Sequence, residues 1–116
     1  MEAVLVALGA PRRREILQLV QGRERSAGEI HRALGGLTFG AVSQHLGILE
    51  RAGLVTVRQE GRRRLYSARP EGLLPLRAWL EPMWDEALVR LQREAEAEEA
   101  GARGGRGRSR GRGRRR

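Results

Sequence analysis

Ser43, Gln44 and Arg51 are the residues whose types and spacing best suit specific chemistry. A helical step of about 100° per residue gathers them on one side of residues 40–51. Their hydroxyl, amide and guanidinium groups donate and accept hydrogen bonds, and the amide of Gln44 can pair bidentately with adenine. Gly40, which has no side chain, keeps this side thin. Such a side suits a DNA major groove, but it fits an ordinary surface helix equally well, so the neighbouring elements must decide.

The opposite side of the same segment is apolar. Val42, Leu46 and Leu49 recur at positions i, i+4 and i+7, which predicts one buried stripe of an α-helix. Thr38 stands where an N-cap is expected, and Gly53 stands where the helix should end. We therefore expect an amphipathic helix whose polar side faces outward.

A second short helix is expected just before this one. Ser26 and Glu29 have the spacing of a capping box, and Gly35-Gly36 ends the helix that the box opens. Two short helices joined by a tight turn containing Gly make a helix-turn-helix, in which the second helix usually enters the groove. His45 lies at the flank of that second helix and is expected to bond a phosphate or the protein backbone.

Two strand-like runs follow, Leu54 to Gln59 and Arg62 to Ser67, on either side of Glu60-Gly61. A two-residue connection containing Gly predicts a tight β-hairpin, which forms a wing when it follows a helix-turn-helix. The hairpin carries cations that can reach phosphates or a narrow minor groove. They are Arg58, Arg62, Arg63 and Arg64. Arginines placed there can instead protect an edge strand from aggregation.

Two helices are also predicted near the N-terminus, one over residues 2–9 and one that begins at Pro11 and ends at Gly22. Residues 12–14, all Arg, fall in the first turn of the second helix, where the helix dipole disfavours cations. They are candidates for phosphate contacts, or they form a solvated charge run.

The last predicted helix is long and amphipathic and covers residues 70–98. Its apolar positions recur at spacings of three and four, and they are Leu73, Leu76, Leu80, Trp84, Ala87 and Leu91. Pro82 lies inside it and should kink or divide it near Trp79–Leu80. Because so small a domain cannot cover so long a helix, we expect a second copy to pair with it, joined by Leu5 of the first helix. Packing within one chain is the alternative.

The net charge of +9 comes entirely from arginine, and residues 101–116 hold eight arginines and no acid. Residues 99–116 are therefore expected to be a disordered tail, which either binds nucleic acid without sequence preference or only solubilises the chain. The absence of Cys excludes disulfides and thiolate metal sites. No apolar run is long enough to span a membrane, so we expect a cytoplasmic protein without membrane contact.

In this order the segments resemble the ArsR/SmtB family of winged-helix transcription regulators, over about residues 3–93. The resemblance is carried by residues 8–13, residues 41–46 with Leu49, residues 52–55, and residues 60–66. It implies a homodimer that represses transcription by occupying a palindromic operator in double-stranded DNA. The last helix, with its Trp residues, is similar to that of the metal-free branch.

Two features depart from the family pattern. Metal-sensing relatives carry Cys before the second helix of the helix-turn-helix or His and Asp pairs on the last helix, whereas His31 and His45 lie elsewhere, so we expect no metal and no cofactor. Gly47 stands where many relatives carry Lys or Arg, and it costs helix stability, about 1 kcal/mol relative to Ala. Ser43 and His45 are two positions apart on one helix and point in different directions, so they do not form a catalytic pair. We therefore expect no enzyme.

We therefore predict a mainly α winged helix-turn-helix with a small β-hairpin, which dimerises through its terminal helices. Residues 1–69 and 70–98 form one compact domain, followed by the tail. The predicted function is a sequence-specific DNA-binding transcriptional regulator, a homodimeric repressor. The alternatives are a nonspecific nucleic-acid binder driven by the tail and a winged-helix module that binds protein. The predicted DNA contacts are Thr38, Gly40, Ser43, Gln44, His45, Arg51, Arg58, Arg62, Arg63 and Arg64. The predicted dimer contacts are Leu5, Leu73, Leu76, Leu80, Trp84, Ala87 and Leu91.

Overall fold

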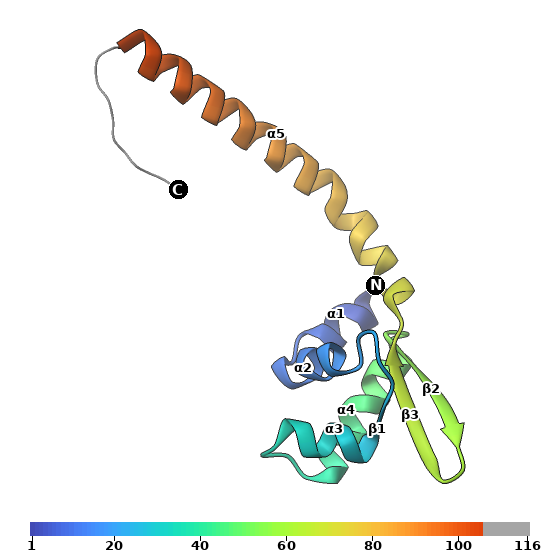
Figure 1. Cartoon of the computed structure of the whole chain (residues 1–116). Helices are drawn as coiled ribbons and strands as arrows, with labels where there is room; N and C mark the ends of the chain where they lie inside the picture. The colour runs from blue at the N-terminus through green and yellow to red at the C-terminus, as the bar shows by residue number, and fades with distance from the viewer. Residues whose placement is uncertain (106–116) are drawn as a thin grey trace. The chain divides into compact units, whose positions relative to one another are not determined.

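The computed structural model describes residues 1–105. The chain divides into two units, and the boundary in the sequence falls between Arg77 and Ala78. The elements are drawn in Figure 1. In chain order they are α1 (Glu2–Leu8), α2 (Pro11–Leu19), β1 (Arg25–Ser26), α3 (Ala27–Leu34), α4 (Phe39–Arg51), β2 (Val55–Glu60), β3 (Arg63–Ala68), the 3₁₀ helix η1 (Pro70–Leu73) and α5 (Leu74–Gly105).

The core of the first unit lies where α1, α2, α3 and α4 meet the sheet. Val42, Leu46 and Leu49 are fully buried, so the apolar stripe predicted for α4 is confirmed. Ile16 of α2 and Ile30 of α3 are buried with them. The back of α4 is thereby fixed against three other helices, and its front is left to solvent.

Both predicted N-caps are confirmed. The Ser26 hydroxyl accepts a hydrogen bond from the Glu29 N–H (3.1 Å), and the Glu29 carboxylate accepts one from the Ser26 N–H (2.7 Å), which completes the capping box of α3. The Thr38 hydroxyl accepts from the Ala41 N–H (3.0 Å) and opens α4. Between the two helices, Gly35 and Gly36 have φ of +65° and +72°, a backbone region that glycine enters without steric cost.

The predicted hairpin is part of a larger sheet. Three antiparallel strands pair in the order β1-β3-β2, and β1 was missed because two residues carry no readable alternation. Glu60 pairs with Arg63, so the turn is Gly61-Arg62, one residue later than predicted. Gly61 has φ of +61°, which the first turn position of tight hairpins requires. We call the β2–β3 hairpin, Val55–Ala68, the wing.

The long last helix differs from the prediction in three ways. Gly72 is buried and Leu76 packs against the core, so the first unit continues to Arg77, past the boundary predicted after residue 69. Pro82 lies inside α5 without dividing it, so the predicted division of the helix near Trp79–Leu80 is wrong. The helix also continues through residues 99–105, expected to be disordered, although three of these seven residues are Gly, which disfavours helix. The rest of the predicted tail, residues 106–116, lies outside the described residues.

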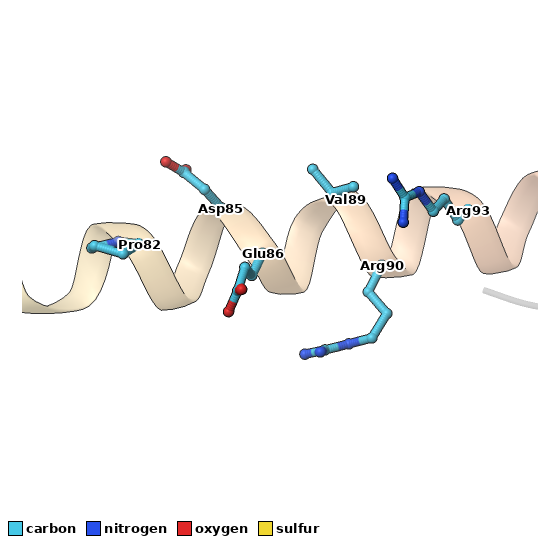
Figure 2. A pocket seen from close by; sticks show the side chains of 6 residues that line it. All are labelled: Pro82, Asp85, Glu86, Val89, Arg90 and Arg93. Atoms are coloured by element: carbon cyan, nitrogen blue, oxygen red, sulfur yellow. The ribbon is translucent and has the colours of Figure 1, made fainter.

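One stretch of α5 within the second unit carries mostly charged side chains. Figure 2 shows Asp85, Val89 and Arg93 pointing to one side, with Glu86 and Arg90 on another. Across the described residues, no helix is both long and apolar enough to cross a membrane.

Candidate nucleic-acid interface

The front of α4 is exposed, as its sequence predicts. We call Gly40, Ser43, Gln44, Gly47 and Arg51 the front face. All except the half-buried Gly47 are exposed, and neither Ser43 nor Gln44 makes a side-chain hydrogen bond within residues 1–105. Their donors and acceptors are therefore available to a ligand, on a helix whose other side is locked into the core.

Gly47 leaves room on the front face for the side chain of Arg51. A Cβ there would lie 3.2 Å from Nη1 of Arg51, so the Arg51 side chain folds back over the gap that glycine leaves. The position at which the family resemblance implies a cation is thus covered by a guanidinium from one turn further along the helix. The front face keeps a positive charge although residue 47 has none.

The turn before α4 is held by His31, for which the sequence predicts no role. Nε2–H of His31 donates a hydrogen bond to the Leu37 carbonyl (2.9 Å), which joins α3 to the turn. The His31 ring also contacts the ring of Phe39 edge to face, with 5.7 Å between centroids. Thr38, predicted as a DNA contact, uses its hydroxyl as the N-cap. His31 and Thr38 together fix the start of α4.

His45 faces the protein rather than the front face. Nη1 of Arg13 donates to its Nδ1 (3.1 Å), while Nε and Nη2 of Arg13 donate to the carbonyls of Ala7 (2.7 Å) and Val6 (3.0 Å). Burial, and then the charges of Arg13 and Arg12, lower the pKa of His45 below its usual 6.5. The neutral ring therefore acts as an acceptor that ties α4 to the end of α1 through Arg13.

The arginines at the start of α2 donate hydrogen bonds to backbone carbonyls at the ends of two neighbouring helices. Arg14 donates to the Leu8 carbonyl (2.6 Å) and Arg12 to the Leu34 carbonyl (3.2 Å). With Arg13 they satisfy the last carbonyls of α1 and α3, where a helix dipole favours cations. Charges that oppose the dipole of α2 thus stabilise two neighbouring helices.

We expect the unfolding free energy of the wild-type protein to fall relative to that of His45→Gln as the pH drops below about 6.5. A histidine whose pKa is lowered on folding binds more protons in the unfolded chain, so its contribution is complete above the unfolded pKa and is lost toward the folded pKa. Glutamine keeps an acceptor for Arg13 and does not titrate. Urea unfolding of both proteins at about pH 7.5 and about pH 5.5 measures the difference, and parallel curves would refute the assignment.

Most of the wing arginines are paired with acids of the body. Nε and Nη2 of Arg58 donate hydrogen bonds to the Glu24 carboxylate (3.0 and 2.8 Å), and Nη1 of Arg58 donates to the Glu60 carboxylate (3.0 Å). These carboxylates raise the pKa of Arg58, and the same contact lowers the pKa of Glu24.

The next two wing arginines are held more loosely. Nη2 of Arg63 lies 3.3 Å from Oε1 of Glu29, and Nη2 of Arg64 lies 3.5 Å from Oε1 of Glu50. The Arg64 guanidinium also lies over the ring of Tyr66. Arg62, in the turn, is exposed and makes no ion pair among residues 1–105. The structure therefore brings the predicted wing cations together but leaves only Arg62 of the four without a competing carboxylate.

Known helix-turn-helix proteins are similar to this chain. A family described as "Helix-turn-helix domain" matches residues 8–58. The HTH-type transcriptional regulator Rv2034 of Mycobacterium tuberculosis (strain ATCC 25618 / H37Rv) is 40% identical over 82 residues, 71% of this chain and 76% of that protein. The uncharacterized HTH-type transcriptional regulator Rv0081 of the same strain is 43% identical over 60 residues, 52% of this chain. The chain spans only 53% of that relative's length.

Solved structures agree with this result. A possible transcriptional regulator for arsenical resistance has a TM-score of 0.63 and 37% identity, covering 78% of this chain and 93% of that one. An ArsR-like transcriptional regulator from Rhodococcus sp. RHA1 has a TM-score of 0.67 and 29% identity, covering 83% and 90%. With its winged helix-turn-helix, the chain thus belongs to the ArsR family of DNA-binding transcriptional regulators, which are not enzymes.

Proposed function

We propose that the protein is a homodimeric, sequence-specific repressor that occupies a palindromic site in double-stranded DNA. The observation that carries this proposal is the front face of α4, whose Ser43 and Gln44 side chains are exposed and unbonded within residues 1–105. In a dimer, two such faces enter major grooves roughly 34 Å apart, one helical turn of DNA. Occupying that site would keep other proteins from the same DNA.

Exposed apolar side chains support the dimer. In the first unit these include Leu5 (42% exposed) and Leu73 (38%), and in the second Leu80 (44%), Trp84 (63%) and Leu91 (59%). Ala87 is half-buried, and Leu76 packs partly against the core of its own chain. So much apolar surface on adjacent helical turns is typical of a helix that pairs with another copy.

We also place the protein in the metal-free branch of the family. The chain has no Cys, and residues 1–105 contain no group of three or more His, Asp or Glu side chains that could hold a metal ion. His31 and His45 are engaged with Leu37 and Arg13 instead. Regulation by an effector other than a metal ion is consistent with these observations.

Replacing Gln44 with Ala should relax the preference for one base pair in each half-site by about 5- to 150-fold, because a bidentate amide contact contributes about 1–3 kcal/mol of discrimination. Affinities of the wild-type protein and the variant for a preferred duplex and its single-base variants measure the change. Gln18→Ala, at an exposed position of α2, is the matched control and should leave discrimination unchanged. A Gln44→Ala protein that discriminates as the wild-type protein does would exclude Gln44 from base recognition.

We propose that Arg58 contacts a DNA phosphate and that the Glu24 carboxylate competes with this phosphate for the Arg58 guanidinium. Glu24→Gln should therefore raise DNA affinity about two- to fivefold at low salt, whereas Arg58→Gln should lower it. Glu71→Gln, which changes the net charge equally but removes a carboxylate of η1 that pairs with no wing arginine in the described part of the chain, is the control. If Glu24→Gln weakens binding as Arg58→Gln does, Arg58 positions the wing and does not contact phosphate.

A further inference from the structure

Phe39 is exposed at the start of α4, and neither the core nor the proposed dimer accounts for it. Its side chain is 50% exposed. Within residues 7–72, all of which the structure describes, it is the only large apolar side chain that is largely exposed. The others lie in residues 1–6 and 73–91, which belong to the helices assigned to dimerisation and the turn that leads into α5.

A single exposed apolar side chain is ordinary on a protein surface, and the place of Phe39 is what gives it meaning. It is the first residue of α4, and the first turns of such a helix are where base edges are contacted. Ser43 follows it by four positions, so the two side chains lie one above the other along one edge of the front face. Gly40 beside it carries no side chain that would shield the ring.

The ring of Phe39 is also held in place before any ligand arrives. The His31 ring meets it edge to face, with 5.7 Å between centroids and 80° between planes. His31 is itself fixed by the hydrogen bond from its Nε2–H to the Leu37 carbonyl (2.9 Å). A large apolar surface is thus presented in a defined orientation, which lowers the entropy cost of using it in binding.

We propose that Phe39 contacts the 5-methyl group of a thymine in the major groove and thereby helps to determine the sequence that the protein prefers. Among the major-groove edges of the four bases, the thymine methyl is the one apolar group, and phenylalanine is one of the side chains that recognise it. The contact removes the methyl group and part of the exposed ring from water together. This inference rests on the proposed function in one respect, that the front face of α4 enters the major groove.

Deoxyuridine, which differs from thymidine only by the missing methyl group, gives a direct test. A preferred duplex is selected from a randomised library with the full-length protein, and each thymine is then replaced by uracil, one at a time. Wild-type protein should lose about fourfold in affinity at one thymine position in each half-site, the loss expected for one buried methyl group. Phe39→Ala should bind the thymine and uracil duplexes equally at that position.

Two further variants separate the possible outcomes. Gln44→Ala should keep the uracil effect while losing discrimination at its own base pair, and Phe39→Leu, which keeps an apolar contact, should keep part of the uracil effect. If no single uracil weakens the wild-type protein, or if Phe39→Ala shows the same loss as the wild type, the Phe39 contact is excluded. The wild-type result stands even if Phe39→Ala fails to fold. A library that yields no preferred sequence at all would instead contradict the proposed function.

Discussion

A chain carrying Trp84→Glu should be monomeric at concentrations at which the wild-type protein is a dimer. Trp84 is 63% exposed in the single chain and stands on the apolar stripe of α5. Buried interface tryptophans contribute about 2 kcal/mol or more each, and a two-fold axis places two of them in one interface. We therefore expect the dimer dissociation constant to rise about 10³-fold or more. Sedimentation equilibrium of both proteins measures it.

Val89→Glu is the matched control for this substitution. Val89 is 47% exposed and also apolar, but it points to the same side of α5 as Asp85 and Arg93 (Figure 2). The helical spacing of Val89 from Trp84, five positions, places it away from the apolar stripe. The variant should remain dimeric. DNA affinity should fall with Trp84→Glu and not with Val89→Glu, because a monomer presents only one α4 to a site with two halves. Two dimeric variants, or a monomeric wild type, would show that α5 does not form the interface.

Local signals predicted the helix-turn-helix well. The spacing of Val42, Leu46 and Leu49 is enough to identify the buried side of α4, because only one helix face can meet the core. The cap residues Ser26 and Thr38 bond groups three positions away, so their partners can be read from the chain itself. The exposed front face follows from the same periodicity.

What the sequence could not predict depends on contacts between distant segments. The spacing of Arg12, Arg13 and Arg14 places them in one helical turn, but their acceptors are carbonyls at the ends of α1 and α3, which only the packed fold brings near. Similarly, the pairing of Arg58 with Glu24 crosses 34 positions. Charge counts describe such residues as ligands for a polyanion, whereas the fold shows what already occupies them.

Phe39 is absent from the DNA contacts predicted from the sequence, for a different reason. Its position at the start of α4 was visible in the sequence, but an aromatic residue there predicts burial as readily as exposure. Its contact with His31 across the turn is a tertiary feature. Its spacing of three positions from Val42 and seven from Leu46 continues the apolar stripe of α4, so periodicity alone predicts a buried ring and gives no sign of its exposure.

Removing residues 106–116 should lower the affinity of the protein for every duplex and make binding less sensitive to salt. The segment holds seven arginines, and each phosphate contact that it makes contributes about 0.9 to the slope of log affinity against log salt. With six to ten phosphates neutralised in total, the full-length protein should lose about 10³- to 10⁵-fold between 50 and 200 mM salt. The shortened protein should lose less. This loss is independent of sequence and leaves base recognition to α4.

The central claim is that the front face of α4 reads base edges, and one ratio tests it most directly. It is the affinity for the selected duplex divided by the affinity for a scrambled duplex of the same composition, measured for the protein without residues 106–116. We predict a ratio of about 10³ or more, as for other specific DNA-binding proteins, even though both affinities fall. A ratio near one for the shortened protein would mean that the arginine-rich segment drives binding and that α4 does not read sequence.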